Sequence, residues 1–282
     1  MKSIALVTAR EAIGLDEDME PLRAALEAEG AAAETVVWDD PAVDWSRYSL
    51  ALLRSTWDYS RRRDEFLDWA RRVEGSVRLA NTAAIVRWNT DKHYLGELAR
   101  AGVPVVPTHY IEPGGEIRFP FDGEFVVKPT VGAGSIDCRR HLEKGEQAAE
   151  HVRRIHASGR SALVQPYLKR VERNGETALV FFRGEFSHAI RKGPMLGSSQ
   201  EIVGGLFLKE DIRPRDPLAW EISVGMLALG HAPGPILYAR VDVIPGNDAM
   251  PVLLELEATE PSLFFAQAPG SAARYARAIL SW

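Results

Sequence analysis

Three carboxylates near the end of the chain have the spacing of a metal site. Two stretches, residues 238–246 and 253–262, each read as a short strand, and a turn around residues 246–248 joins them. Because residues two apart on a strand point the same way, Glu255 and Glu257 share one face, and Asp242 on the neighbouring strand can meet them. Such carboxylates repel one another unless a cation lies between them. Their hard oxygen ligands suit Mg²⁺, which usually brings nucleotide phosphates.

A second chemical element lies upstream, where an apolar strand ends in Lys128. The loop that follows contains Gly132, Gly134 and Ser135. Glycines let backbone amides approach phosphate oxygens without a Cβ atom in the way, and a lysine supplies a point charge. A solvated surface lysine is the alternative, but it is less expected at the end of an apolar strand. The pattern therefore predicts a strand and loop that bind phosphate.

In this order and spacing, the two elements resemble the ATP-grasp superfamily, most closely its glutathione-synthetase-like branch. That family follows its aspartate strand with Glu-hydrophobic-Asn-x-x-x-Pro, and the matching run here is 255–261. Glu257 replaces the usual asparagine, which keeps an oxygen ligand and adds a negative charge. The resemblance implies an α/β (α+β ATP-grasp) fold with ATP and Mg²⁺ as cofactors.

The implied architecture has three parts. Residues 1–84, in which short apolar runs alternate with helix-spaced ones, read as an N-terminal βαβ domain. Residues 85–165 form a central subdomain with Lys92 and Lys128, and residues 166–282 form a C-terminal subdomain with the metal-binding carboxylates. ATP would be clamped between the last two parts.

The resemblance assigns the nucleotide contacts to four elements. They are two lysines, the glycine loop, a hinge whose backbone reads adenine, and an acidic residue for the ribose. In chain order these residues are Lys92, Lys128, Gly132, Gly134, Ser135, Gln165, Pro166, Tyr167, Leu168 and Glu172. An exposed loop charge is the alternative for Glu172.

Basic side chains for the transferring phosphate are expected on two strands. The family often places a basic residue at the end of a hairpin strand, and Arg191 is our choice because a guanidinium binds phosphate and carboxylate oxygens bidentately. Strand alternation would then turn Lys192 to the opposite face. Arg240, two residues before Asp242, is compatible with both charge stabilisation and a salt bridge. With Lys128, these two arginines are the catalytic candidates.

Substrate contacts are expected at a strand end and after the carboxylate strand. In open parallel sheets, ligands bind beyond the carboxyl ends of the strands, where residues 54–59 are expected to lie. A loop packed by its own aromatic rings is the alternative for that segment. The resemblance adds an acidic residue at the substrate hairpin and the turn after the metal strand. The candidates are Arg54, Ser55, Trp57, Glu176, Glu260 and Ser262.

Several runs also resemble cycloserine synthetases, which are ATP-dependent cyclo-ligases acting on O-ureido-D-serine. These runs are residues 43–46, 125–130, 163–167, 187–190 and 260–263. The resemblance implies an ADP-forming carboxylate–amine ligase that acts through an acyl phosphate on a small amino-acid-like substrate. The nitrogen would belong to the same molecule or to a second amino acid. A non-catalytic nucleotide-binding regulatory protein and a small-molecule kinase are the rival interpretations.

The composition is that of a globular protein and argues against several classes of partner. The net charge of the 282 residues is −5, whereas a nucleic-acid binder usually carries a basic face. Cys138 is the single cysteine, which rules out an internal disulfide and fits a reducing cytoplasm. No apolar run is long enough for a membrane span, and a strand begins at once, which leaves no room for a signal peptide. We expect a cytoplasmic enzyme, and a homo-oligomer is compatible with the sequence.

Overall fold

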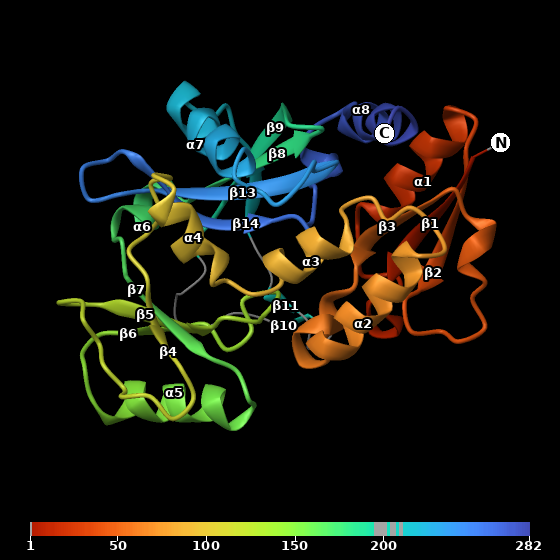
Figure 1. Ribbon diagram of the computed structural model, residues 1–282. Helices are drawn as coiled ribbons and strands as arrows, with labels where there is room; N and C mark the ends of the chain where they lie inside the picture. The colour runs from red at the N-terminus through yellow and green to blue at the C-terminus, as the bar shows by residue number, and fades with distance from the viewer. Residues whose placement is uncertain (1, 195–201, 204–206, 209–210) are drawn as a thin grey trace.

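The computed structural model describes residues 2–194, 202–203, 207–208 and 211–282. These residues form three larger sheets and one short hairpin. Figure 1 shows the N-terminal sheet on one side of the molecule, the C-terminal sheet beside it and the central sheet below. The architecture is the mixed α/β arrangement that the resemblance implied.

The N-terminal sheet is parallel and has the order β2-β1-β3, as the βαβ pattern predicts. Its strands are β1 (Ser3–Thr8), β2 (Ala32–Val37) and β3 (Leu50–Ser55). Every residue of β3 is buried, because the sheet is covered on both faces. Helix α2 (Arg63–Glu74) packs in one core cluster, while α1 (Met19–Ala28) packs in the other. The carboxyl ends of β1 and β3 therefore lie side by side.

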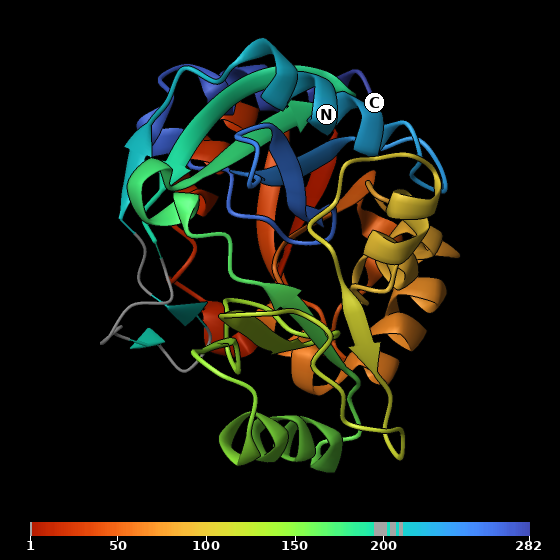
Figure 2. The same cartoon turned by 90° about the vertical axis from the view of Figure 1, so that its left-hand side faces the viewer.

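The central sheet is antiparallel and has the order β4-β7-β5-β6. Its strands are β4 (His109–Ile111), β5 (Phe125–Pro129), β6 (Arg139–His141) and β7 (Ala162–Pro166). Helix α5 (Glu146–Ala157) buries Ala148, Val152 and Ile155, which are spaced for one helical face, against β5 and β7. Figure 2 shows α5 covering the outer face of this sheet. The inner face is left to line a cavity.

The C-terminal sheet is antiparallel and has the order β12-β9-β8-β13-β14. Its strands are β8 (Glu176–Phe182), β9 (Glu185–Lys192), β12 (Ile212–Pro214), β13 (Tyr238–Pro245) and β14 (Pro251–Glu257). Helix α7 (Ala219–Leu229) packs on one face, and the short α6 (Arg170–Asn174) lies near β13. This sheet brings the two strands of the carboxylate motif together at one edge.

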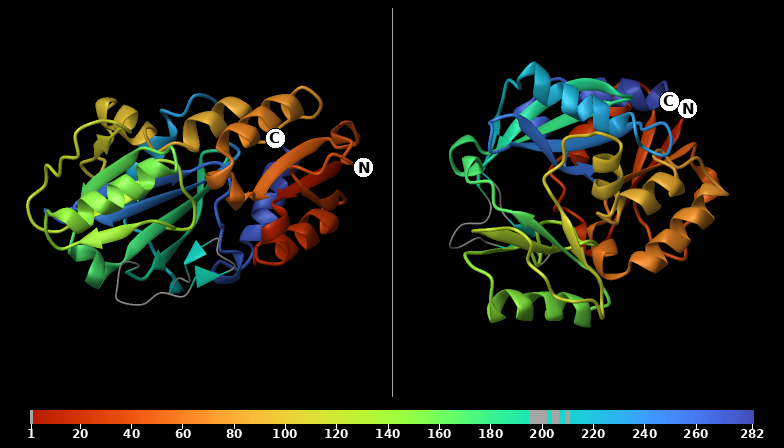
Figure 3. Two further views of the ribbon diagram at one scale, coloured as in Figure 1. Left: turned by 90° about the horizontal axis from the view of Figure 1, so that it is seen from below. Right: turned by 60° about the vertical axis from the view of Figure 1, so that its left-hand side comes forward.

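Two segments pack differently from the expected division at residues 84 and 165. Helices α3 (Ala83–Asn89) and α4 (Tyr94–Arg100) bury Ile85, Tyr94 and Leu95 against the C-terminal sheet, not the central one. Helix α8 (Ser271–Leu280) buries residues against the N-terminal sheet and α1, and Figure 3 shows it beside the red N-terminal elements. The outer two parts of the chain are thus joined through shared cores.

Short elements complete the fold. Residues 193–217 are rich in Gly, Ser, Pro and charged residues, which predicts a mobile loop, and part of this segment (195–201, 204–206 and 209–210) lies outside the described residues. Its described part includes β12 and the hairpin of β10 (Ile202–Val203) and β11 (Phe207–Leu208). The 3-10 helices are η1 (Arg10–Ala12), η2 (Trp45–Arg47), η3 (Trp57–Arg61) and η4 (Phe265–Gln267). In the described part of the chain, no helix combines the length and apolar character that a membrane crossing requires.

Candidate active site

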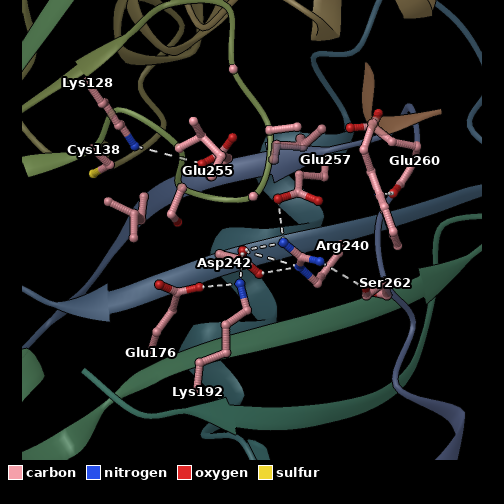
Figure 4. A pocket seen from close by; sticks show the side chains of 18 of the residues that line it. Lys128, Cys138, Glu176, Lys192, Arg240, Asp242, Glu255, Glu257, Glu260 and Ser262 are labelled. Carbon is pink, nitrogen blue, oxygen red and sulfur yellow. Dashed lines mark hydrogen bonds and ion pairs between the residues drawn. The ribbon is translucent and has the colours of Figure 1, made fainter. Parts of the chain in front are cut away.

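A cavity of about 620 Å³ lies where the three parts of the chain meet. The central sheet contributes Lys128 and the hinge, and the C-terminal sheet contributes the carboxylates. The N-terminal domain contributes Trp57 and a loop that includes Asp16 and Asp18. Figure 4 shows the carboxylates and the basic residues converging from β13, β14 and β9. The cavity therefore holds most of the chemistry that the sequence predicts.

The register of β13 and β14 decides how the carboxylates meet. Asp242 lies directly opposite Glu255, and Arg240 lies opposite Glu257, with an irregularity in the pairing just after Asp242. Side chains on opposite residues of an antiparallel pair are close neighbours. The expectation that Asp242 approaches the Glu255 face is therefore confirmed, and all three carboxylates line the cavity.

Basic side chains separate these carboxylates in this structure. Lys192 Nζ lies 2.7 Å from Asp242 Oδ2, and Arg240 Nε donates to Asp242 Oδ1 at 2.9 Å. Arg240 also pairs with Glu257 through its Nη2 atom. Within the described residues, no group of three or more His, Cys, Asp or Glu side chains is arranged around one metal position. The cations that the clustered acids require are, at this stage, supplied by the chain itself.

The two lysines expected to hold phosphates meet at one carboxylate. Lys92 Nζ lies 3.0 Å from Glu255 Oε1, and Lys128 Nζ lies 3.7 Å from Glu255 Oε2. Lys92 Nζ also donates to the Gly132 carbonyl at 2.9 Å. The spacing of Lys92, Leu95 and Leu98 predicts one helix that carries all three residues. The chain instead places Lys92 in the turn between α3 and α4, where its backbone N–H donates to Thr130 O. The glycine loop is thereby tied to Lys92, and Glu255 links Lys92 with Lys128.

The electrostatics divide the carboxylates into two kinds. Burial opposes the charged forms of Asp242 and Glu255, but Arg240 with Lys192 and Lys92 with Lys128 outweigh it, so the pKa of each carboxyl is lowered. Burial raises the pKa of Glu257 to about 7, because Arg240 offsets only part of the burial and of the repulsion from Glu255 and Asp242. The site therefore carries more buried acid than its basic groups compensate.

Glu260 adds to this surplus of buried acid, and its pKa is raised further than that of Glu257. Burial, with repulsion from Glu257, raises the pKa of Glu260 to about 8. An acidic surplus built from oxygen ligands fits a hard divalent cation, and the lysines that now occupy Glu255 fit phosphate oxygens. The residues present thus fit both Mg²⁺ and a nucleotide.

The hinge after β7 forms the apolar end of the cavity. Val106, Leu168 and Ile244 make a small buried cluster there, with Val171 and Leu254 packed against it. Gln165 is buried, and its amide donates to Thr108 Oγ1. The expected hinge residues Gln165, Pro166, Tyr167 and Leu168 all line the cavity, as do Gly132, Gly134 and Ser135. An apolar end in a cavity that is also lined by two lysines has the polarity of a site for a base and its phosphates.

The choice of Arg191 over Lys192 is wrong in this structure. Lys192 is buried and lines the cavity, whereas Arg191 turns away and its Nε atom donates to the Asn174 carbonyl at 2.9 Å. Neighbouring residues on a strand face opposite sides of the sheet. Arg191 was chosen because a guanidinium is the better phosphate ligand, but it lies on the face of β9 that is turned away from the cavity. Lys192, with Nζ also 2.7 Å from Glu176 Oε1, is the residue that the sequence reasoning missed.

Three other candidates lie outside the cavity lining. Glu172 is exposed and pairs with Arg140 at 2.9 Å, because α6 directs it to the surface. Ser55 is fully buried, and its hydroxyl lies 2.8 Å from Thr8 Oγ1 at the joined ends of β1 and β3. Arg54 is also fully buried and contacts protein groups. These residues support the site without reaching the cavity.

Arg54 belongs to a network that fixes the turn after β14. Its Nη1 atom donates to Pro261 O at 3.2 Å, and its Nη2 atom lies 3.3 Å from Asp16 Oδ2. The Asp18 carboxylate accepts hydrogen bonds from the backbone N–H groups of residues 263, 264 and 265 at 2.6, 3.0 and 2.8 Å, respectively. Phe264 takes a left-handed conformation, with φ of 56°, inside this turn. Neither acid has a spacing that would identify the role from sequence.

The remaining substrate candidates gather at the end of the cavity near this turn. Trp57 Nε1 donates to the Glu260 carbonyl at 3.3 Å, and Arg240 Nη1 donates to the Ser262 carbonyl at 3.3 Å. Trp57, Glu176, Glu260 and Ser262 all line the cavity. The expected substrate side of the site is therefore assembled from the N-terminal domain and the C-terminal sheet together.

Comparison with known proteins finds similarity along the whole chain. Residues 4–81 match the family model for the N-terminal domain of the D-cycloserine synthetase DcsG. The cycloserine biosynthesis protein DcsG of Streptomyces lavendulae is 39% identical over 296 residues, which cover 99% of this chain and 98% of that protein. The crystal structure of D-cycloserine synthetase DcsG superposes with a TM-score of 0.90 at 37% identity, covering 99% of each chain.

A more distant structure shares the fold. D-alanine–D-alanine ligase of Bacillus anthracis, complexed with ATP, has a TM-score of 0.71 at 14% identity and covers 100% of this chain and 97% of that one. Identity at that level supports the fold alone, while the likeness to DcsG extends over the full chain. This protein therefore belongs to the DcsG family of ATP-grasp ligases and is an ATP-dependent enzyme that forms C–N bonds.

Proposed function

We propose that this protein activates the carboxylate of a small amino-acid-like substrate with ATP and closes a ring onto a nitrogen of the same molecule. The observation that carries the proposal is the group of Lys92, Lys128, Lys192 and Arg240, which face the acids of β13 and β14 in one cavity. A cavity with phosphate-binding cations at one end and a buried acid–aromatic wall at the other suits a nucleotide and an amino acid together. The full-length likeness to DcsG supports the cyclising version.

Binding of ATP would exchange the ion pairs of the lysine end. Lys92 and Lys128 would leave Glu255 for phosphate oxygens, and Asp242, Glu255 and Glu257 would then hold Mg²⁺. Bound Mg²⁺ neutralises phosphate charge during transfer. The hinge residues 165–168 would hold the base, with the apolar slot excluding water from it. Each carboxylate thus keeps a positive partner before and after the nucleotide enters.

The reaction has two steps, and in each of them one bond forms and one breaks. A substrate carboxylate oxygen attacks the γ-phosphorus, the bond to the β-phosphate oxygen breaks, and ADP leaves an acyl phosphate. The substrate nitrogen then attacks the acyl carbon, the bond to phosphate breaks, and the nitrogen loses its proton to solvent. Lys192 and Arg240 would face the charge that develops on the transferring group, which is where preorganised cations are most effective.

The proposal is tested by measuring ADP and free phosphate with Mg·ATP against a panel of amino acids that includes O-ureido-D-serine. Release of both products with one compound alone supports a cyclo-ligase. Release only with a pair of compounds supports ligation of two substrates, and a stable phosphoester supports a kinase instead. ATP binding without turnover across the panel would overturn the proposal in favour of a regulatory protein.

A further inference from the structure

One buried acid in the cavity has a side chain without a partner among the residues that the structure describes. Glu260 is 7% exposed and lines the cavity, yet its carboxylate makes no hydrogen bond or ion pair with any residue that the structure describes. Only its backbone carbonyl is used, by the indole N–H of Trp57. An unpaired buried carboxylate is costly, so such a group is expected where a ligand completes it.

The other acids of the site differ in this respect. Asp242, Glu255 and Glu257 each contact at least one lysine or arginine. Figure 4 places Glu260 beyond Glu257, on the side away from the Lys128–Glu255 pair. The chain's own cations therefore serve the phosphate end and leave this acid open.

The backbone around Glu260 is held in place. The next residue, Pro261, receives the buried Arg54 guanidinium on its carbonyl at 3.2 Å. Asp18 binds the backbone of residues 263–265 a few positions on. Glu260 thus directly precedes a segment whose backbone is held at Pro261 and at residues 263–265, and its own carbonyl accepts the Trp57 indole N–H. A preorganised acid of this kind binds a cation with little ordering cost.

Aromatic rings indicate which cation fits. Trp57 and Tyr59 line the same cavity, and Tyr59 is itself buried. Burial, and after it the charge of Glu260, raises the pKa of the Tyr59 hydroxyl. An acid beside aromatic faces suits an organic ammonium, through charge-assisted hydrogen bonds and cation–π attraction. A hydrated Mg²⁺ is better matched to the all-oxygen set of β13 and β14.

We infer that Glu260, with Trp57 and Tyr59, binds the α-ammonium group of the substrate and makes the enzyme specific for substrates that carry a free amino group. This inference rests on the proposed function, since it names the substrate group that the same cavity recognises. It also orients the molecule: with the ammonium at Glu260, the adjacent carboxylate of an α-amino acid is directed toward Arg240 and the phosphate end.

The test compares O-ureido-D-serine with its deamino analogue, in which hydrogen replaces the amino group. Turnover is followed as ADP release in the wild type, Glu260→Gln, Glu260→Asp and the exposed-surface control Glu143→Gln. In the wild type, loss of the ammonium is expected to raise KM about 10- to 100-fold, the range of a charge-assisted contact. Glu260→Gln should raise KM for the amino compound by a similar factor and leave the analogue almost unchanged. Glu260→Asp should recover part of the loss, and Glu143→Gln should match the wild type.

Each other outcome overturns the inference in a recognisable way. Equal use of both compounds by the wild type, or undiminished discrimination by Glu260→Gln, removes the ammonium role while the ligase activity stands. A fall in kcat with unchanged KM makes Glu260 a reacting group instead of a binding group. A clear drop in the unfolding temperature of ligand-free Glu260→Gln makes it a structural residue. Wild-type silence with every amino acid overturns the proposed function, and this inference falls with it.

Discussion

The two ends of the cavity treat buried acids in opposite ways. At the β13–β14 end, Asp242 and Glu255 are each held by two basic side chains, and the pKa of each carboxyl is lowered. At the turn after β14, Glu260 has no such partner among the described residues, and burial raises its pKa to about 8. The cavity therefore has a compensated end, where basic side chains pair with the buried acids Asp242 and Glu255, and an uncompensated end, where Glu260 lacks such a partner among the described residues.

The difference teaches which ligand charge each end accepts. At the compensated end, an anion such as a phosphate can take over the lysines, provided that a cation replaces them on the acids. At the uncompensated end, an incoming cation can pair with Glu260 without breaking an ion pair between that side chain and a described residue. One cavity can thus bind a polyanion and an amino acid in a fixed orientation.

The largest effect is expected from removing a cation at the compensated end. Lys128→Met should lower turnover by about a thousandfold or more, because a phosphate contact in the transition state is lost. The fold should survive, since methionine keeps an apolar stem and Glu255 still has Lys92 at 3.0 Å. ADP release, with circular dichroism as the folding check, measures both. Near-normal turnover would remove Lys128 from the site.

The next prediction separates two adjacent residues of β9. Lys192→Met should lower kcat about a hundredfold, because it removes a buried cation next to Asp242. Arg191→Met should change kcat less than about threefold, since that side chain faces away from the cavity. Steady-state kinetics on the matched pair decides between the two faces of the strand. The reverse ranking would restore the original choice of Arg191.

A smaller effect is expected from loosening the turn that holds Glu260. Asp18→Asn removes one acceptor oxygen from a carboxylate that binds three backbone N–H groups. The free energy of unfolding should fall by about 2 kcal/mol, and KM for the amino-acid substrate should rise. The affinity for ATP should stay the same, because Asp18 binds residues 263–265 and not the hinge residues 165–168 that are expected to hold the base. Chemical denaturation and nucleotide titration test the two halves, and an equal loss of ATP affinity would contradict the division of the cavity.

The smallest effect is a difference in pH dependence between the two kinds of acid. Because the folded-state pKa of Glu260 lies above its ordinary value of 4.5, its contribution favours the folded state at low pH and is lost as the pH rises toward 8. Glu260 interacts electrostatically with several charged or titratable neighbours, so its own contribution has to be measured against a variant that lacks its carboxyl group. These neighbours are Lys92, Arg240, Glu255, Glu257 and Tyr59. Between pH 5 and pH 8, ligand-free wild type should lose about 1–2 kcal/mol of unfolding free energy relative to Glu260→Gln.

Asp242 supplies the opposite sign for that comparison. Its pKa is lowered, so its contribution is present at neutral pH and is lost as the pH falls through the acidic range. Asp242→Asn should therefore destabilise the protein at pH 7, because it leaves Lys192 and Arg240 short of a charge. Urea denaturation of both variants and the wild type across this pH range measures the two contributions. If the stability difference from the wild type changed with pH in the same direction for both variants, the two acids would be equivalent and the prediction would be wrong.

Local patterns were enough to predict most of the fold. The alternating apolar runs of the first domain gave its parallel sheet, and two acids two residues apart gave the face of β14. Helix spacing was less informative around Lys92, where the chain forms a turn instead of one continuous helix. A lysine bound to the glycine loop and to Glu255 gains more from that turn than from helical hydrogen bonds, and these contacts are long-range.

The residues of the site could be predicted where the residue type and the order of the strands along the chain both pointed to the same position. They were harder to predict where two adjacent strand residues face opposite sides and one of the two had to be chosen. Lys128, Asp242 and Glu255 follow from the strands that carry them. Lys192 did not, because one residue of register decides which side chain enters the cavity. The Asp18 contacts with residues 263–265 join positions that are distant in sequence, and no local pattern reports such a pair.

The position of α8 has a consequence for how the chain is made. Tyr275 and Ile279 complete the core that contains Ile4, Leu6 and Leu22. During synthesis the first domain therefore emerges with one apolar face open, and that face is covered only when the last ten-residue helix has left the ribosome. A premature stop just before residue 271 would leave the catalytic strands intact and yet release a chain with an exposed, aggregation-prone first domain.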